Sequence, residues 1–376
     1  MTMEQYDVLI VGGGPAGSSL AWGLRDSGLR VMVLDKQSFP RNKVCAGWIT
    51  PAVLEALQLD PEQYRGRHTM QPIHGFRISC MDGKQVATTQ HEQPLSFGIR
   101  RFEFDHYLLQ RCGADVVAEP LADLTRNGKD WIINGRYQAS LLVGAGGHFC
   151  PVARHLGARP GTGEITVAAQ EIEFPMSVQQ QRACCIDGRT PELFFCTDLK
   201  GYGWVFRKGE YLNIGLGRED QHRLSEHVKA FCGYLRDKGK LAFELPAKFN
   251  GHAYLLYNHS RRKLAGDGVL LIGDAAGLAY PQSGEGIRPA IESGLLAASI
   301  IREADGDYRV GRLAGYSERI LQRFGKRSTA RSPLDYFPAG LKRILAGGLL
   351  SRRWFVEHTV IDQWFLHRHQ SPLAAE

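Results

Sequence analysis

The sequence predicts an α/β protein, α+β overall, and three features along the chain lead to that prediction. An apolar run at 8–11 enters a glycine-rich turn, an Ala- and Leu-rich segment follows, and a second apolar run at 31–34 ends on Asp35, which is the pattern of a βαβ unit. Residues 166–261 are dominated by short strand patterns typical of an antiparallel sheet. The last stretch, 331–376, is expected to be helical.

The glycines of the first turn follow the spacing Gly12-x-Gly14-x-x-Gly17, and each has a separate task. Gly12 permits the tight turn, Gly14 lets the backbone approach a pyrophosphate, and Gly17 lets the helix pack closely on the strand. The helix N-terminus then offers N–H groups to phosphates, and Asp35 stands where a carboxylate binds ribose hydroxyls. Because all the parts occur in order, we predict a dinucleotide-binding unit rather than an ordinary tight turn.

The composition bounds the class of protein. With 376 residues, 43% of them hydrophobic and 23% charged, the chain has an ordinary globular composition and a length that suggests about two domains. It contains no apolar run of about 18 residues, so we expect no membrane span. Acidic residues precede the first strand, which leaves no room for a signal peptide, and we expect a cytoplasmic protein.

The net charge and the cysteine spacing limit the classes of molecule that the protein is expected to bind. The net charge of +7 is spread over short clusters and favours acidic partners, such as phosphorylated ligands, an acidic electron carrier or an anionic lipid surface. No nucleic-acid-binding motif is present, so we expect no nucleic acid partner. The eight cysteines lack C-x-x-C spacing and nearby histidines at metal-ligand spacing, so we expect reduced thiols and no metal site.

The first half of the chain continues from the βαβ unit through a loop at 36–48. Thr50 and Pro51 then fit the N-cap and first position of a helix to about residue 57. Residues 71–99 alternate as strands around Asp82-Gly83, a hairpin signal, and read as an excursion out of the nucleotide-binding domain. A helix at 101–109 returns the chain to that domain, and short strands follow at 115–117, 131–133 and 141–143.

The second half adds strands between 166 and 217, a helix at 223–238 and an extended stretch at 248–257. The apolar run 269–272 then ends on Gly273-Asp274, as a buried parallel strand does when it presents a ligand at its carboxyl edge. A small-residue helix is predicted for 285–304. The basic aromatic tail from residue 338 fits either ordinary amphipathic helices or a segment that lies on a membrane or caps an apolar pocket.

Three separated motifs together resemble the FAD-dependent enzymes of the para-hydroxybenzoate hydroxylase fold. They are the first glycine turn with Asp35, then Arg101-x-x-Phe104-Asp105-x-x-Leu108, and then Gly273-Asp274-Ala275-Ala276 followed by Pro281-x-x-Gly284-x-Gly286-Ile287. The resemblance implies a Rossmann-like FAD-binding domain, an inserted antiparallel-sheet substrate domain and a C-terminal helical tail. The bounds we predict are 1–70, 100–165 and 262–330 for the first, 71–99 and 166–261 for the second, and 331–376 for the tail.

The same resemblance implies a role for each matching residue. The glycine turn holds the FAD pyrophosphate, Asp35 the ribose and Asp274 the ribityl or pyrophosphate part, while Gly284 to Ile287 lie beside the isoalloxazine ring. The full set of predicted cofactor-binding residues is Gly12, Gly14, Pro15, Ala16, Gly17, Asp35, Lys36, Lys43, Cys45, Ala46, Arg101, Gly273, Asp274, Gly284, Gly286 and Ile287.

Two further segments resemble the geranylgeranyl reductases within that fold. Arg41-x-Lys43-x-Cys45-Ala46-Gly47 is similar to the Lys-x-Cys-Gly-Gly loop of that family, and Tyr202-x-Trp204-x-Phe206-x-Lys208, followed by Asn213-Ile214-Gly215, is similar to its aromatic segment. Ala46 and Arg207 depart from the family pattern, which has glycine and proline there. The resemblance implies an isoprenoid cavity beside the flavin, whereas the alternative is that these aromatics are strand core and Cys45 an inert thiol.

The function implied is reduction of carbon–carbon double bonds of an isoprenoid or similarly apolar substrate by hydride from reduced FAD. Cys45 and Tyr202 are the candidate catalytic residues, for positioning or proton supply. NAD(P)H or a small acidic electron carrier is expected to reduce the flavin. The predicted substrate pocket comprises Trp48, Tyr202, Trp204, Phe206 and Pro281.

Three alternatives remain open from the sequence. A flavin-dependent monooxygenase that hydroxylates an aromatic or other electron-rich molecule shares the fold, so the fold does not discriminate it. A flavin halogenase is disfavoured because the Trp-x-Trp-x-Ile-Pro segment is absent. A non-enzymatic FAD- or lipid-binding carrier would use the tail, and we expect any peripheral membrane contact to run through residues 338–368.

Overall fold

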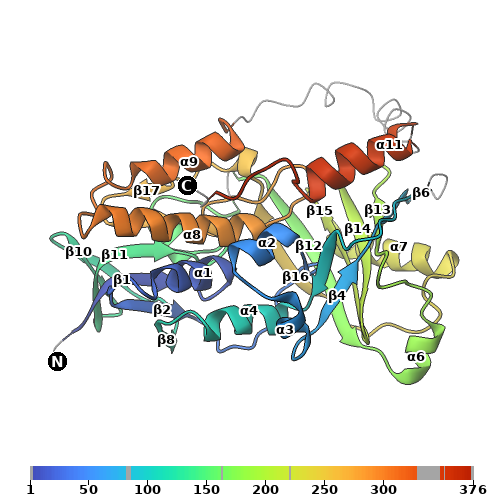
Figure 1. The fold of residues 1–376 in the computed structure, drawn as a ribbon, viewed down its shortest axis with the longest axis horizontal. Helices are drawn as coiled ribbons and strands as arrows, with labels where there is room; N and C mark the ends of the chain where they lie inside the picture. The colour runs from blue at the N-terminus through green and yellow to red at the C-terminus, as the bar shows by residue number, and fades with distance from the viewer. Residues whose placement is uncertain are drawn as a thin grey trace.

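The computed structural model describes residues 3–81, 86–161, 164–219, 222–327, 348–350 and 352–373. Two large β-sheets lie toward opposite ends of the molecule, and the long helix α8 (Ile287–Ala304) runs above the first (Figure 1). The prediction of a mixed α/β fold with a nucleotide-binding unit at the N-terminus is confirmed.

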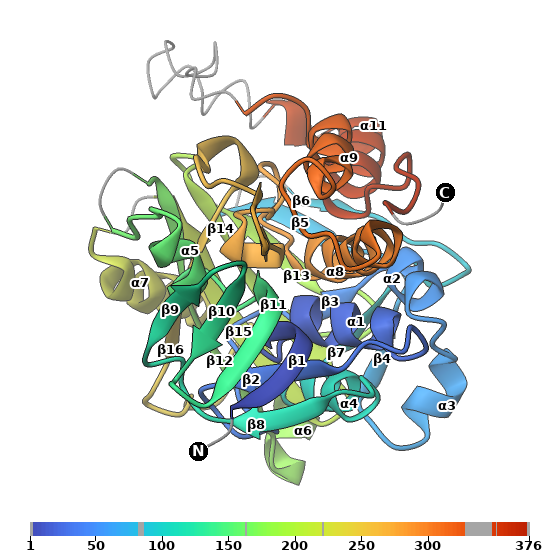
Figure 2. The same cartoon turned by 90° about the vertical axis from the view of Figure 1, so that its left-hand side faces the viewer.

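The first sheet has eight strands and a parallel centre. Helices α1 (Pro15–Leu24) and α8 pack against each other beside this sheet (Figure 2). Along the sheet the strands are β17 (Ala265–Gly266), β18 (Val269–Leu271), β11 (Tyr137–Gly144), β1 (Glu4–Val11), β2 (Val31–Asp35) and β8 (Asp115–Ala118), with β10 (Asp130–Ile133) paired to β11 and β9 (Leu124–Asn127) paired to β10.

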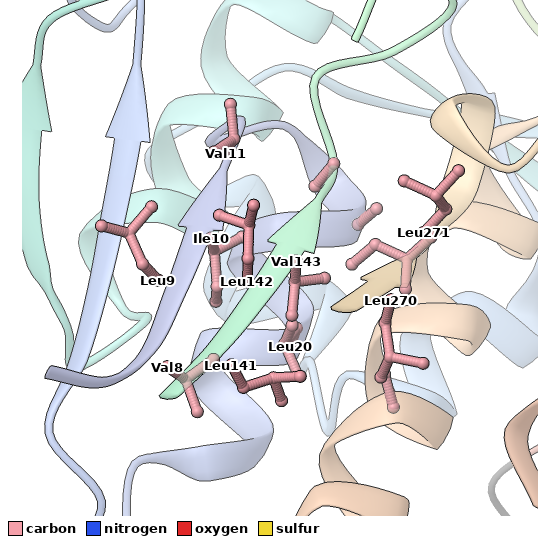
Figure 3. Close-up of a cluster of buried hydrophobic side chains, with 14 of the residues drawn as sticks. Val8, Leu9, Ile10, Val11, Leu20, Leu141, Leu142, Val143, Leu270 and Leu271 are labelled. Atoms are coloured by element: carbon pink, nitrogen blue, oxygen red, sulfur yellow. The ribbon is translucent and has the colours of Figure 1, made fainter. Parts of the chain in front are cut away.

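The core of the first sheet explains its uninterrupted apolar runs. Val8, Leu9 and Ile10 of β1 are completely buried between their neighbours (Figure 3). Leu20 of α1 and Leu270 of β18 join the same cluster. Because helices and loops cover both faces of a parallel sheet, successive side chains on either face are apolar.

The second sheet has seven strands, antiparallel except where β13 pairs with β5. Helix α7 (Leu224–Asp237) covers it with Val228, Phe231 and Leu235. The order is β16 (Asn250–Leu255), β12 (Thr166–Pro175), β15 (Tyr211–Arg218), β14 (Gly201–Lys208), β13 (Glu192–Phe195), β5 (Arg77–Cys80) and β6 (Val86–Thr88). The predicted Asp82-Gly83 hairpin turn lies outside the described residues.

A small three-stranded sheet, β3 (Trp48–Ile49), β7 (Ser96–Ile99) and β4 (Met70–Ile73), contacts β14 of the second sheet through β7 and β4. Three helices follow its strands along the chain: α2 (Pro51–Ala56) and α3 (Pro61–Arg65) lie between β3 and β4 in the sequence, and α4 (Arg101–Gln110) follows β7. Helix α2 begins at Pro51 as predicted, but the Thr50 hydroxyl makes no capping hydrogen bond, whereas Asp60 caps α3 by accepting from two amides.

The strands divide between the large sheets by chain segment. Every described strand of the eight-stranded sheet comes from 1–70, 100–165 or 262–330, and every described strand of the seven-stranded sheet from 71–99 or 166–261. The domain bounds themselves remain a prediction. The other helices are α5 (Pro151–His155), α6 (Val178–Ala183) and α9 (Ala314–Phe324).

The described part of the C-terminal tail packs back onto the body. Helix α11 (Arg353–Phe355) leads into a π-helical segment, Val356–Phe365, whose buried side chains join the Trp48 cluster. Of the predicted tail 331–376, residues 331–347, 351 and 374–376 lie outside the described residues. Among the helices that the structure describes, none is both long and apolar enough to cross a bilayer.

Candidate active site

A cavity of about 750 Å³ joins the two large sheets. On one side its walls are the glycine turn, Asp35 and Arg101, and on the other they are residues of β13, β14 and β16 together with Phe365 of the tail. The predicted site residues that line it are Gly12, Gly14, Pro15, Ala16, Asp35, Lys36, Lys43, Cys45, Ala46, Trp48, Arg101, Tyr202, Trp204, Asp274, Gly284, Gly286 and Ile287.

The glycine turn is built so that only glycine fits at two of its positions. Gly12 has φ +117°, and a Cβ there would overlap the carbonyl of Ala145, while a Cβ on Gly17 would overlap the Gly12 carbonyl oxygen. Gly17 therefore supports the turn from behind without lining the cavity. Asp35 accepts hydrogen bonds from the amides of Gly13 (2.7 Å) and Gln37 (3.0 Å), so its carboxylate also holds the turn in shape.

The N-terminus of α1 points its unused donors at the cavity. Gly14 occupies the N-cap position with no side-chain capping bond from any described residue, and Pro15 is the first helical residue. The amides of the first turn are therefore available to phosphate oxygens. Gly273 has φ +56° and does not line the cavity, and a Cβ there would lie 2.9 Å from the Cβ of Ala16, so it supports the cradle from behind.

Arg101 enters the cavity from the start of α4. Its Nε and Nη2 donate to the two carboxylate oxygens of the fully buried Asp105, at 2.6 and 2.7 Å. Arg41 lies 3.8 Å from the same carboxylate. The paired bonds orient the Arg101 guanidinium, because a bidentate contact fixes its plane.

Lys43, His252 and Asp274 form a polar cluster on the cavity wall. The Lys43 ammonium contacts the His252 ring, and His252 Nε2 lies 3.8 Å from Asp274 Oδ2. Burial lowers the pKa of Lys43 to about 8, and burial together with the Lys43 charge lowers the pKa of His252 to about 4. Burial alone raises the pKa of Asp274, but the adjacent His252 and the charge of Lys43 outweigh burial and lower it to about 2.

At neutral pH this cluster thus holds a charged carboxylate, a neutral imidazole and a mostly charged lysine. The sequence motifs predicted Lys43 and Asp274 but not His252, which lies on β16 in no recognisable pattern. Among the described residues, no three His, Cys, Asp or Glu side chains are placed to hold a metal ion.

The loop that carries Cys45 is held by buried polar side chains of the second sheet. The Cys45 amide donates to Glu171 (2.6 Å), and Asn213 Nδ2 donates to the Cys45 carbonyl (3.1 Å) and to Glu171 (3.0 Å). Trp204 Nε1 in turn donates to Asn213 (2.7 Å). Burial raises the pKa of Glu171 to about 7. The aromatic segment therefore positions the cysteine loop as well as lining the cavity.

Two predicted pocket residues lie elsewhere, which corrects the prediction. Phe206 is buried behind Trp48, with ring centroids 5.3 Å apart, and does not line the cavity. Pro281 borders a separate depression of about 90 Å³. Phe206 shares a strand face with Trp204, but Trp48 of the small sheet covers it.

The tail supplies an aromatic residue that the motifs did not predict. Phe365 lines the cavity, with its ring 5.3 Å from Trp48 and 5.7 Å from Tyr202. Of the alternatives for the tail, the described residues support a segment that closes an apolar pocket. Only the general aromatic character of this stretch pointed that way in the sequence.

Tyr202 is committed to a structural bond. Its hydroxyl donates to the carbonyl oxygen of Ser283 at 2.6 Å, and burial raises the pKa of Tyr202 well above its ordinary value. The adjoining wall consists of Gly284, Glu285, Gly286 and Ile287. Glu285 lies within the stretch Gly284 to Ile287 that was predicted to lie beside the isoalloxazine ring, but it was not singled out as a site residue.

Comparison with known proteins agrees with this geometry. A family model described as an FAD binding domain matches residues 5–95. The chain is 27% identical over 341 residues to a digeranylgeranylglycerophospholipid reductase of Methanocaldococcus jannaschii, covering 86% of this chain and 82% of that protein. It is 28% identical over 355 residues to the enzyme of the same name from Methanothrix thermoacetophila, covering 88% and 87%.

Solved structures share the fold. A geranylgeranyl bacteriochlorophyll reductase-like protein of Thermoplasma acidophilum superimposes with a TM-score of 0.78 and 21% identity over 99% of this chain and 100% of that one. A complex of the halogenase PltM with FAD gives a TM-score of 0.69 and 16% identity over 99% of this chain and 88% of that one.

The cavity fits FAD on its own features: a turn with two positions that only glycine fits, a helix N-terminus without a side-chain cap among the described residues, and Arg101 and Lys43 as nearby positive charges. The motifs, the fold and the relatives agree, and the predicted cofactor is confirmed. The chain is an FAD-dependent oxidoreductase that is similar in sequence and fold to geranylgeranyl reductase-like proteins.

Proposed function

We propose that this enzyme reduces carbon–carbon double bonds of an isoprenoid chain. The observation that carries the proposal is one continuous cavity, walled by the glycine cradle on one side and by Trp48, Tyr202, Trp204 and Phe365 on the other. Such a cavity places an apolar chain against the nucleotide-binding part of the protein. The names of the relatives support a prenylated substrate rather than a free aromatic molecule.

Bound FAD supplies the hydride once it has been reduced. The residues of the chain have three tasks. The glycine turn and the first amides of α1 would hold the pyrophosphate, Asp35 the ribose, and Arg101 and Asp274 the adjoining parts. The aromatic wall would orient the double bond and exclude water. An unactivated alkene has no carbonyl to polarise, so positioning has to supply much of the rate enhancement.

The loop of Cys45 contributes to that positioning. Both its amide and its carbonyl are bonded to buried side chains, Glu171 and Asn213, so the loop is fixed relative to the second sheet. We therefore assign Cys45 and Tyr202 to orientation of substrate and cofactor rather than to proton transfer. NAD(P)H and an acidic electron carrier remain the two candidate reductants.

We also propose that the enzyme acts in the cytoplasm at the surface of a membrane, where a prenyl lipid resides. Supporting this, Trp354 is 68% exposed and the adjacent Arg352 and Arg353 are exposed as well. An exposed aromatic beside cations suits an anionic lipid interface. Sedimentation with anionic vesicles should capture the wild type and not Trp354→Asp. Equal capture of both would contradict the contact.

The reaction is tested by reducing the flavin anaerobically with dithionite and adding geranylgeranyl compounds, with aromatic compounds as the comparison. Reoxidation by a prenyl compound without oxygen, together with a gain of two hydrogens per reduced bond, is the expected result. If the flavin reoxidises only when oxygen is admitted, and the product then carries an oxygen atom, the enzyme is a monooxygenase and this proposal is wrong.

A further inference from the structure

We propose that the carboxyl group of Glu285 is the proton donor that completes reduction of the double bond, an inference that rests on the proposed function. Glu285 lines the shared cavity between Gly284 and Gly286. It therefore lies on the wall that both the cofactor and the aromatic cluster adjoin.

The Glu285 backbone and one carboxylate oxygen are firmly held. The Tyr280 amide donates to the Glu285 carbonyl (2.9 Å), and the Arg288 amide donates to Glu285 Oε1 (2.7 Å). The preceding Ser283 is tied to Tyr202 across the cavity. The side chain is thus fixed in place, as a group that must meet one carbon of a bound alkene has to be.

The second carboxylate oxygen, Oε2, is shielded from solvent and has no hydrogen-bond partner among the described residues. A buried oxygen left in this state is costly if it carries charge, and a native structure retains such a group for a reason. A protonated carboxyl lowers that cost, because the neutral form tolerates burial better. Burial of this unpartnered oxygen thus favours the protonated form of the Glu285 carboxyl group, which is the form that a proton donor needs.

The surroundings of Glu285 place the pKa of its carboxyl group near neutral pH, so the group can both hold a proton and release it. The groups that face Glu285 are Arg288 and Glu292 of α8, together with Tyr280 and Tyr202. Burial raises the pKa of Glu285 to about 7, and Arg288 only partly opposes this. The Arg288 guanidinium is bonded to Glu292 at 2.7 Å, so much of its charge is compensated there.

The nearest rival donor is less suited to the step. The Tyr202 proton is directed at the Ser283 carbonyl and would have to leave a hydrogen bond that holds the wall together. The structural alternative for Glu285 is that it merely caps α8 through the Arg288 amide. Glutamine can accept that same bond but carries no acidic proton, so Glu285→Gln separates the two roles.

The step balances as follows. One alkene carbon accepts the hydride that reduced FAD supplies, and the other accepts the Glu285 proton. The π bond is thereby replaced by two C–H bonds, and the alkene gains two electrons. The carboxylate that remains takes a proton from water before the next cycle.

The test compares the wild type with Glu285→Gln, just before α8, and with Glu303→Gln, an exposed position near the end of α8 that serves as the matched control. Each flavin is reduced with dithionite and reoxidised anaerobically by a prenyl compound. We expect reoxidation to slow about 100-fold in Glu285→Gln, the size of a lost general acid, and to be unchanged in Glu303→Gln. Flavin content should be equal in all three.

A second readout does not depend on turnover. Infrared difference spectra of the holoenzyme across neutral pH should show a carboxylic acid band that disappears with a midpoint near pH 7. Because burial also raises the pKa of Glu171 to about 7, the band should lose part of its amplitude in Glu285→Gln and keep all of it in the control. If the wild type turns over but Glu285→Gln matches it, or if Glu285→Gln loses none of the band, the inference is wrong. If no prenyl compound reoxidises even the wild type, the proposed function fails, and this role fails with it.

Discussion

The hydroxyl of Tyr202 donates a 2.6 Å hydrogen bond to the carbonyl oxygen of Ser283 and thereby links β14 of the second sheet to the loop that leads into α8. This bond holds together two walls of one cavity that come from different sheets. The bond also engages the hydroxyl proton of Tyr202, a residue that the sequence had suggested as a proton donor to the substrate.

Tyr202→Phe should therefore behave as a structural change. The Ser283 carbonyl loses its partner, and we expect stability to fall by about 1–3 kcal/mol. Reoxidation by a prenyl compound should slow less than about tenfold, because no general acid is removed. Thermal unfolding and anaerobic stopped-flow measure the two effects. Tyr211→Phe, on the neighbouring strand and outside the cavity, is the control, and a rate loss of about 100-fold in Tyr202→Phe would restore its role as acid.

Replacement of two glycines in the first turn should separate binding from folding. A Cβ at Gly14 would lie 3.4 Å from the end of the Arg41 side chain and meets no backbone atom, so Gly14→Val should leave the apoprotein folded while blocking phosphate approach. Gly17→Ala should destabilise the fold itself, because its Cβ overlaps the Gly12 carbonyl. The flavin absorbance per mole of protein measures cofactor binding by each variant, and thermal unfolding of the apoproteins measures their stability. A fully yellow Gly14→Val protein would refute the assigned cradle.

FAD affinity should fall as the pH rises through the pKa of Lys43, which is about 8. Below that pH the ammonium is charged and attracts the anionic cofactor, and above it the amine is neutral and the attraction is lost. Because the folded pKa lies below the ordinary value of 10.5, burial of the charged form also costs the apoprotein stability at neutral pH, a cost that disappears toward alkaline pH. Fluorescence titration of FAD should show about tenfold weaker binding at the alkaline end.

The matched variants for that experiment are Lys43→Arg and Lys43→Met. Arginine stays charged over the whole range, so its profile should be flat, and methionine should bind weakly at every pH. A wild-type break that persists in Lys43→Met would assign the titration to another group.

Phe365→Ala should open the aromatic end of the cavity. The side chain is 1% exposed and packs on Trp48 and Tyr202, so we expect a loss of about 3–5 kcal/mol from the cavity it leaves. The KM for a prenyl substrate should rise more than kcat falls, because we expect Phe365 to contact the prenyl chain of the substrate rather than its reacting atoms. Trp354→Ala, exposed on the same tail, should leave both stability and KM unchanged when the substrate is presented in detergent. An unaltered KM in Phe365→Ala would remove the tail from the substrate site.

Local patterns determined much of this protein. The glycine turn with Asp35, the apolar strand that ends at Gly273-Asp274 and the small-residue helix after it each reflect backbone geometry or burial within a few consecutive residues. Such constraints are written directly into neighbouring positions, which is why the fold and the cofactor could be predicted and why most of the predicted site residues line the cavity.

Only the tertiary structure decided which distant side chains share the site. His252 meets Lys43, Glu171 holds the amide of Cys45, and Phe365 closes the cavity, although none of these pairs is close in the chain. Phe206 was predicted from the resemblance of the same aromatic segment that contains Trp204, and it lies behind Trp48 instead. The alternation of a strand determines the face on which a side chain lies. What covers that face depends on how separate sheets pack, and no local pattern records it.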